Sequence, residues 1–204
     1  MRALATVSGM ESAGSTAVWQ MIQQLGVPVK KQHGYSSDPN RVIFATLRDM
    51  RDVITSLWRR ECLGTKNDPD NYALGCLRYV QPRFEQMRAY EGNSNAVIIR
   101  YEAFVADPGV ILDLVAKRLR VDLTPERRSE ILDYCSLKKN KERAATMTDF
   151  AEWDKENLVH GNHISTDGKM GSWQDLAATL KPETVQAIED GTREFLVYFG
   201  YETE

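Results

Sequence analysis

The sequence predicts an α/β protein in which a central parallel sheet lies between two layers of helices, a three-layer sandwich. Three observations support this fold class. Short apolar stretches alternate with longer segments whose apolar residues recur at helical spacing. The stretch at 42–47, Val-Ile-Phe-Ala-Thr-Leu, is apolar almost throughout, which is typical of a central parallel strand covered on both faces. The first expected strand also runs directly into a glycine-containing loop and a helix.

Length and composition fit one domain. The chain has 204 residues, of which 42% are hydrophobic and 27% charged, so it can bury a core without metal or disulfide support. We therefore expect residues 1–204 to form a single domain.

The first half of the chain contains three expected strands and two helices. Val18, Trp19, Ile22 and Leu25 recur at helical spacing after the first loop, and Gly26 follows them as a helix stop. In order, the expected elements are strand 3–8, helix 16–25, strand 27–29, strand 42–47 and helix 52–62.

Pairs of a capping residue and a proline mark helix starts in the second half, since proline suits the first helical position. These pairs are Asp68 with Pro69, Asp107 with Pro108, and Thr124 with Pro125. The expected elements are helix 69–90, strand 96–99, a helix from 108 that holds Val110, Leu114, Val115 and Leu119, a helix ending near 135, and helix 182–199. Residues 136–173 are polar and are expected to be largely irregular.

The first loop has the spacing of a phosphate-binding loop. Gly9 and Gly14 lie five residues apart and are followed by Ser15 and Thr16. Glycines let backbone N–H groups close on an anion, and the start of a helix turns its free N–H groups toward the charge. Ser15 stands where nucleoside-triphosphate hydrolases carry a lysine, and a simple strand–helix turn with a serine cap remains an alternative.

A second anion site is expected after the central strand. Arg48 follows that strand directly, and Ser56 lies eight residues on, in the first turns of the next helix. Ligands of open parallel sheets bind at the carboxyl ends of the strands, where a guanidinium and a hydroxyl suit a phosphate.

These segments together resemble the sulfotransferases that use 3′-phosphoadenosine-5′-phosphosulfate (PAPS) as sulfuryl donor. The resemblance rests on five segments in the family's order, between residues 8 and 173. They are the Ser-Ala-Gly-Ser-Thr loop at 12–16, Lys-Gln-His at 31–33, Arg-Asp-Met-Arg-Asp with Ser at 48–56, the Tyr-Glu to Asp-Pro stretch at 101–108, and Gly-Lys-Met-Gly-Ser-Trp at 168–173.

The resemblance implies an activity and a set of binding residues. The chain would move a sulfuryl group from PAPS to a hydroxyl or amine, release 3′-phosphoadenosine-5′-phosphate (PAP) and need no metal. Arg48 and Ser56 would hold the 3′-phosphate, and Tyr101 would lie beside the adenine. The implied nucleotide-binding residues are Ser12, Ala13, Gly14, Ser15, Thr16, Arg48, Ser56, Tyr101, Gly168, Lys169, Met170 and Gly171.

The sequence departs from the family at two cations. The loop lysine or arginine of the family falls on Ser12, and the Arg-Lys pair before the late glycine is replaced by Thr166 and Asp167. We expect Lys31 to supply the first missing charge and Lys169 the second.

His33 is the expected catalytic base, because an imidazole can titrate near the working pH. Glu11 is the rival base; it ranks second because bound phosphates would repel its carboxylate. His160 and His163 lie near each other, but no further ligands are obvious, so no metal site is expected and both are interpreted as solvated loop residues.

Charge and composition limit the partners. The net charge of −3 gives no sign of nucleic-acid binding, and no apolar run approaches a membrane span. Three scattered cysteines and the lack of a signal peptide favour the cytoplasm. The acceptor is expected to be a small molecule or a glycan.

Two other functions remain open. One is a nucleotide kinase-like P-loop enzyme, for which Asp49 is the only tempting magnesium ligand. The other is a non-catalytic nucleotide-binding module, which the loss of the loop cation at Ser12 makes plausible.

Overall fold

The computed structural model describes residues 4–62, 67–149, 151–161, 164 and 168–203. Its first half contains β1 (Ala5–Gly9), α1 (Ser15–Gln24), β2 (Val29–Lys31), β3 (Val42–Leu47), α2 (Met50–Glu61), α3 (Pro69–Val80), α4 (Arg83–Glu91) and β4 (Ala96–Arg100). The rest contains α5 (Tyr101–Ala106), α6 (Pro108–Leu119), α7 (Pro125–Tyr134), α8 (Leu137–Ala144), β5 (Trp153–Asp154), β6 (Val159–His160), α9 (Trp173–Ala177) and α10 (Pro182–Tyr198).

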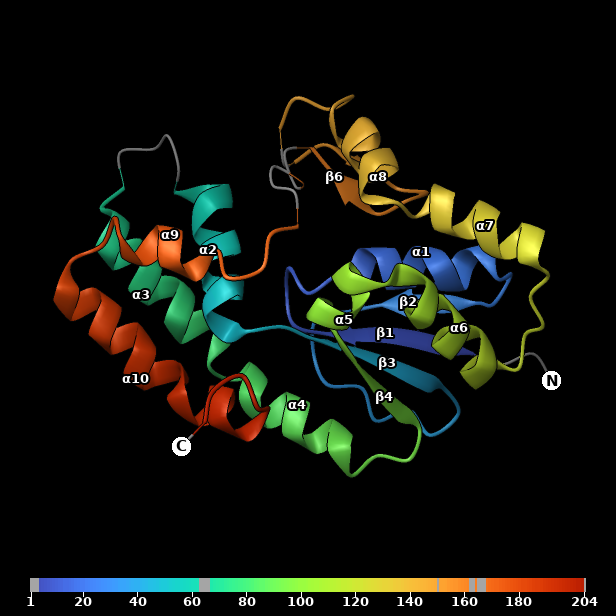
Figure 1. The fold of residues 1–204 in the computed structure, drawn as a ribbon, viewed down its shortest axis with the longest axis horizontal. Coiled ribbons are helices and arrows are strands. Elements are labelled where there is room, and N and C mark those ends of the chain that lie inside the picture. Colours follow the sequence, from blue (N-terminus) through green and yellow to red (C-terminus); the bar gives the residue numbers. More distant parts are fainter. Residues whose placement is uncertain (1–3, 63–66, 150, 162–163, 165–167, 204) are drawn as a thin grey trace.

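Four strands form a parallel sheet in the order β2-β1-β3-β4 (Figure 1). In the register of the sheet, Phe44 of β3 lies opposite both Val7 of β1 and Val97 of β4. Since all four strands run the same way, their carboxyl ends meet at one edge, where the segments after Gly9, Lys31, Leu47 and Arg100 begin.

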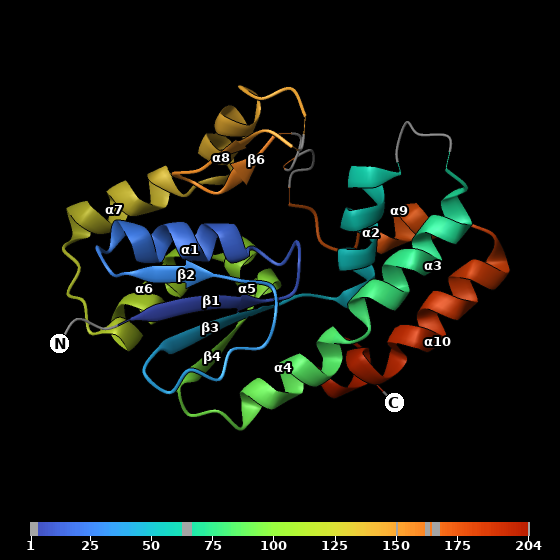
Figure 2. The same cartoon turned by 180° about the vertical axis from the view of Figure 1, so that it is seen from behind.

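Each face of the sheet is covered by its own hydrophobic core. Ala5, Val7 and Phe44 pack with apolar residues of α1, α6 and α7 on one face. Ile43 and Leu47 point the other way and pack with α2, α3, α4 and α10. Figures 1 and 2 show these two helical layers with the sheet between them. The predicted three-layer α/β architecture is therefore confirmed.

One prediction about helices was wrong. The helix expected over 69–90 is two helices, α3 and α4, because Pro82 has no N–H to continue the ladder and instead precedes the first residue of α4. The helix expected from 108 is α6, and within it Ile111, Leu112 and Val115 fill the core, whereas Val110 and Leu114 are 56% and 37% exposed.

The segment 136–173 is more regular than the sequence predicted. It holds α8 and the antiparallel pair β5-β6, with Trp153 opposite His160. Of the residues in α8, Asn140 and Ala144 are buried, so the helix has almost no apolar periodicity for the sequence to reveal. The short helices α5 and α9 were also not predicted.

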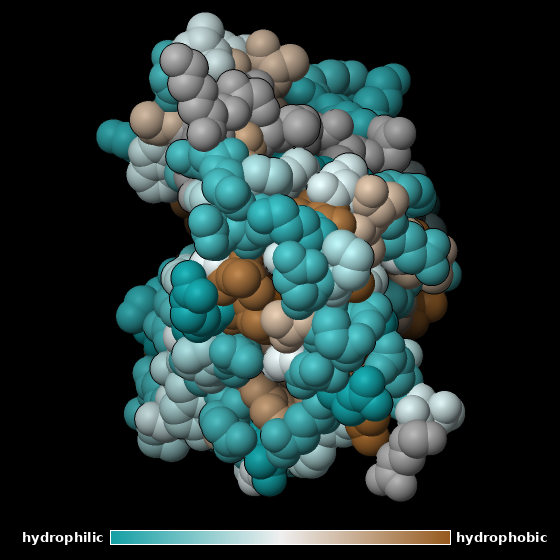
Figure 3. Space-filling view, turned by 90° about the vertical axis from the view of Figure 1, so that its left-hand side faces the viewer, coloured by the Kyte–Doolittle hydropathy of each residue, from teal (hydrophilic) through white to brown (hydrophobic). Residues whose placement is uncertain are grey.

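The surface seen from the side of α3 and α10 is mostly hydrophilic, with apolar residues gathered in a small hollow near its middle (Figure 3). Within the described part of the chain, no helix combines the length and the apolar character that a membrane crossing requires.

Candidate functional site

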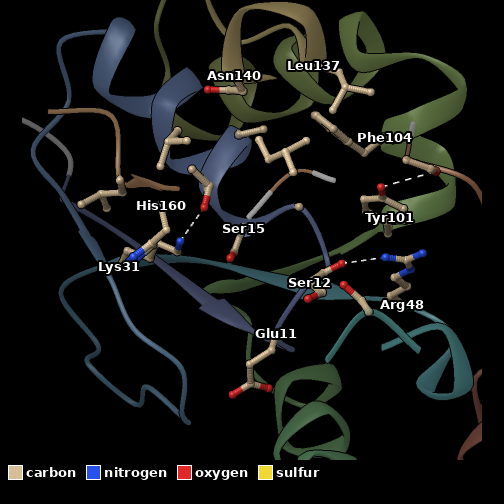
Figure 4. A pocket seen from close by; sticks show the side chains of 18 of the residues that line it. Glu11, Ser12, Ser15, Lys31, Arg48, Tyr101, Phe104, Leu137, Asn140 and His160 are labelled. Atoms are coloured by element: carbon tan, nitrogen blue, oxygen red, sulfur yellow. Dashed lines mark hydrogen bonds between the residues drawn. The ribbon is translucent and has the colours of Figure 1, made fainter. Parts of the chain in front are cut away.

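A pocket of about 240 Å³ lies at the carboxyl edge of the sheet (Figure 4). All four strands contribute to its lining through the segments that follow them. The structure brings eleven of the predicted site residues together in this lining: Glu11, Ser12, Gly14, Ser15, Thr16, Lys31, His33, Arg48, Ser56, Tyr101 and Gly168.

The loop between β1 and α1 has a backbone shape that only certain residues allow. Gly9, Ser12 and Gly14 have φ values of 121°, 55° and 81°. A Cβ on Gly9 would lie 2.3 Å from the carbonyl oxygen of Thr46, so this position also requires glycine for space. Ala13 anchors the loop in the core and does not line the pocket.

Helix α1 begins at this loop without a side-chain cap. Its N-cap residue is Gly14, and no side chain accepts a hydrogen bond there. The serine-capped turn that the sequence left open is therefore not what forms. N–H groups of the first helical turn lack intrahelical partners and carry the positive end of the helix dipole. Ser15 and Thr16 line the pocket beside them, so this end suits an anion.

Lys31 brings a positive charge to the same loop. Its Nζ donates a hydrogen bond to Thr16 Oγ1 at 2.6 Å (Figure 4). Burial lowers the pKa of Lys31 to about 8, since the protein interior disfavours the ammonium form. The last residue of β2 thus places an amine at the start of α1.

Arg48 connects the phosphate loop to the opposite end of the pocket. Its Nη1 donates to the carbonyl oxygen of Ser12 at 3.0 Å, and its Nη2 lies 3.3 Å from the Asp52 carboxylate and donates to the carbonyl of Lys169 at 3.2 Å. The guanidinium carbon lies 4.2 Å from the centre of the Tyr101 ring. Arg48 Nε is buried with no partner among the described residues. An anion in the pocket would satisfy it, so the donor set fits a phosphate.

Asp52 holds the loop at 168–173, the late loop, against α2. Its carboxylate accepts hydrogen bonds from the N–H groups of Gly171 and Trp173, at 2.9 and 3.0 Å, and from the Ser172 hydroxyl at 3.1 Å. Because Asp52 is buried and also pairs with Arg48, this one carboxylate fixes both the loop and the guanidinium.

Only part of the predicted late loop lines the pocket. Gly168 lines it, and its carbonyl lies 3.5 Å from the Tyr101 hydroxyl. Lys169 Nζ instead pairs with Asp175 at 3.1 Å, and Met170 is 46% exposed. Lys169, Met170 and Gly171 are not among the lining residues.

Glu11 is held in an ion pair. Arg83 Nη2 donates to its carboxylate at 2.7 Å, and the Tyr79 hydroxyl donates at 2.9 Å. Burial, the largest single influence, raises the pKa of Glu11, but Arg83, the backbone and Tyr79 together hold that pKa below its usual value. Glu11 is therefore an ionised, weakly basic carboxylate.

His33 lies in the same pocket on a loop tied to the sheet. Partial desolvation lowers the pKa of His33; nearby Glu11 raises it, and Lys31 lowers it further, so the pKa lies below its usual 6.5. Its loop is fixed by Tyr90, whose hydroxyl accepts the Ser36 N–H at 2.8 Å and lies 2.8 Å from Ser8 Oγ. The imidazole is neutral at pH 7 and can accept a proton.

Sequence reasoning missed one wall of the pocket. Phe104 of α5 and Leu137 and Asn140 of α8 line it, together with Leu158 and His160. These elements were expected to be irregular or were not predicted, so no periodic signal marked them. The wall is joined to α1 by a reciprocal pair of 2.9 Å hydrogen bonds between the Gln20 and Asn140 amides.

Two further lining residues lacked an assigned role. His160 was interpreted as a solvated loop residue, but it belongs to β6 and stacks on Trp153 with 5.6 Å between ring centres. Arg60 lies one helical turn after Ser56 on α2, a spacing that could have revealed it. His163 lies outside the described residues. Among those that are described, no three His, Cys, Asp or Glu residues gather as metal ligands would.

Solved structures share this fold at low sequence identity. The mouse sulfotransferase SULT7A1 complexed with PAP has a TM-score of 0.69 and 12% identity, over 96% of this chain and 84% of the other. Retinol dehydratase matches with a TM-score of 0.72 and 14% identity in complex with retinol and PAP. In complex with androsterone and PAP it matches with 0.71 and 13%, and in both cases the match covers 94% of this chain and 80% of the other.

A comparison with curated proteins found no match. The family model described as "Sulfotransferase domain" matches residues 28–199, which is most of the chain. This protein therefore belongs to the sulfotransferase domain family.

Proposed function

We propose that this protein transfers a sulfuryl group from PAPS to a hydroxyl or amine of a small-molecule or glycan acceptor, without a metal, and that residues 1–204 act as one domain. The observation that carries the proposal is one pocket that joins an uncapped helix start and Lys31 at one end to Arg48 and Ser56 at the other. That arrangement suits a nucleotide with phosphates at two positions.

The loop end of the pocket would stabilise charge during transfer. PAPS supplies an activated sulfuryl group whose leaving group is a phosphate. The free N–H groups at the start of α1, with Ser15 and Thr16, would hold that phosphate. Their hydrogen bonds strengthen as negative charge develops on the phosphate during transfer. Lys31, 2.6 Å from Thr16, adds the cation that Ser12 lacks.

The other end of the pocket would hold the 3′-phosphate and the adenine ring of the nucleotide. Arg48 offers its Nε, which has no partner within the described part of the chain, and Ser56, another lining residue, offers a hydroxyl. Tyr101 and Phe104, with ring centres 6.5 Å apart, provide an apolar wall against which a purine can pack.

His33 is the proposed general base. Its pKa below 6.5 keeps the imidazole neutral at pH 7, ready to take the acceptor's proton. Glu11 is less suited, because Arg83 and Tyr79 occupy its carboxylate and its pKa is lowered. We assign Glu11 to positioning this side of the pocket.

The candidate magnesium ligand of the kinase-like alternative, Asp49, is engaged in other contacts. Asp49 caps α2 by accepting the Arg51 N–H at 2.9 Å and also pairs with the Arg51 side chain at 2.8 Å. Both carboxylate oxygens are therefore engaged, and we do not favour a metal-dependent NTP reaction.

The acceptor class and the compartment are further proposals. Retinol dehydratase, one of the structural neighbours, was crystallised with retinol and with androsterone, which supports a small-molecule acceptor. Cys62, Cys76 and Cys135 are buried and are not joined in disulfides, which supports a reducing compartment such as the cytoplasm.

Transfer of radiolabelled sulfate from PAPS to a panel of alcohols, phenols, amines and glycans tests the function. We expect the wild-type protein to label at least one acceptor. His33→Ala should lower kcat by about 10²- to 10⁴-fold while leaving PAP affinity unchanged, because the base acts only on the acceptor.

Glu11→Gln serves as the comparison. If Glu11→Gln abolished turnover while His33→Ala retained it, the base assignment would be wrong. If PAP bound but the wild-type protein labelled no acceptor in the panel, the non-catalytic binding module would be favoured.

A further inference from the structure

One face of α2 carries the polar residues at the far end of the pocket. Asp52, Ser56 and Arg60 are spaced four residues apart, so they lie in one row along the helix. Asp52 holds Arg48 and the late loop, and both Ser56 and Arg60 line the pocket. Arg60 therefore lies on the same side of the pocket as the residue proposed to contact the 3′-phosphate.

Arg48 alone is a poor match for a doubly charged phosphate. Its charge is already balanced by Asp52 at 3.3 Å, and both side chains are buried. Its Nη1 and Nη2 donate to Ser12, Asp52 and Lys169, which leaves Nε as the donor with no partner among the residues that the structure describes. A phosphate monoester carries about −1.5 to −2 charges at pH 7, so this end needs a second cation.

Lys169 does not supply that cation. Its Nζ pairs with Asp175 at 3.1 Å, its side chain is 61% exposed, and it is not a lining residue. Arg59 is also turned to Asp175, at 3.2 Å, and does not line the pocket. Arg60, by contrast, lies one helical turn after Ser56 on α2 and is a lining residue of the pocket.

We propose that Arg60 binds the 3′-phosphate and determines the preference for a 3′,5′-bisphosphate over a 5′-monophosphate. The proposal rests on the proposed function, since it extends the 3′-phosphate site formed by Arg48 and Ser56. A planar guanidinium can donate two parallel hydrogen bonds to a phosphate, which makes it suited to this discrimination. Thr166 and Asp167 stand where the resemblance would place an Arg-Lys pair, and Arg60 supplies the positive charge that is missing there.

Calorimetry with PAP and with adenosine 5′-monophosphate tests the assignment. Arg60→Gln should weaken PAP binding by about 10- to 100-fold, the usual range for a charged hydrogen bond, and leave affinity for the monophosphate unchanged. Arg59→Gln is the matched control, because it removes the neighbouring guanidinium outside the pocket. It should bind both nucleotides as the wild-type protein does.

The outcomes separate this inference from the function on which it rests. If the wild-type protein bound PAP no better than the monophosphate, the proposed function itself would fail. If the wild-type protein preferred PAP and Arg60→Gln kept that preference in full, only the role of Arg60 would be refuted. Equal losses for both nucleotides would likewise refute a specific contact with the 3′-phosphate.

Discussion

The two ends of the pocket hold their positive charges in different ways. At the loop end, Lys31 makes a hydrogen bond to Thr16, and its pKa is about 8. At the α2 end, Arg48 is buried, paired with Asp52, and bonded to the backbone of both the phosphate loop and the late loop. We therefore expect that the first cation can be removed without disturbing the fold, whereas the second also fixes the two loops that it contacts.

The largest effect is expected for Arg48→Ala. The substitution removes a phosphate ligand and leaves the Asp52 carboxylate buried without its ion-pair partner. Breaking a buried pair in this way costs about 3–5 kcal/mol. We expect PAP binding to fall by at least ~100-fold and the free energy of unfolding to fall with it, as measured by calorimetry and urea denaturation.

Arg51→Ala is the control, because Arg51 lies three residues after Arg48 but pairs with Asp49 and Glu202 and does not line the pocket. It should leave PAP affinity unchanged. If Arg48→Ala kept wild-type stability and wild-type PAP affinity, Arg48 would be neither a phosphate ligand nor a structural residue, and the proposed difference between the two ends would be wrong.

Lys31→Met should affect binding alone. The methionine keeps the apolar stem and removes a desolvated cation, so we expect about 10- to 100-fold weaker PAP binding with equal or higher stability. Lys30→Met is the matched control, since Lys30 is exposed on the neighbouring position of β2. A loss of stability comparable to that of Arg48→Ala would show that both cations are structural.

The pH dependence of binding should distinguish the two ends further. Without a nucleotide, Lys31 loses its proton above about pH 8, while a bound phosphate favours the ammonium form and raises its pKa. Above pH 8, PAP binding must therefore take up a proton, and affinity should fall by up to about tenfold per pH unit. Lys31→Arg should remove this decline, because guanidinium stays charged. A decline that persists in Lys31→Arg would assign it to another group.

The smallest effect is expected for Lys169→Ala. The sequence favoured Lys169 as a phosphate ligand, but its Nζ pairs with Asp175 outside the pocket. Because exposed ion pairs contribute only about 0–1 kcal/mol, PAP affinity should stay within about twofold of wild type. A tenfold loss of PAP affinity in Lys169→Ala would show that Lys169 contributes to nucleotide binding.

The sheet and its carboxyl edge could be predicted from the sequence. The apolar stretch at 42–47 coincides with β3 (Val42–Leu47), and glycine spacing placed the phosphate loop at the end of β1. Residues next to strand ends converge in any parallel sheet, which is why Arg48, Tyr101 and Lys31 could be named before the structure. Lys31 was expected to supply the missing loop charge; its amine donates to Thr16 at the start of α1, and its role stays a prediction.

The remaining wall depends on contacts that no periodicity encodes. Asn140 lies on a helix with few buried apolar residues, and its place is fixed by a hydrogen-bonded amide pair with Gln20. The direction of Lys169 was also hidden, because Asp175 draws its amine away from the pocket. A polar pair decided both outcomes, one between distant segments for Asn140 and one between near neighbours in the chain for Lys169.

Calorimetry of the wild-type protein with PAP in the absence of metal, against ATP with magnesium, tests the central claim most directly. A pocket with two anion ends predicts that PAP binds more tightly than ATP with magnesium. Tighter binding of ATP with magnesium, or no binding of PAP, would contradict the account.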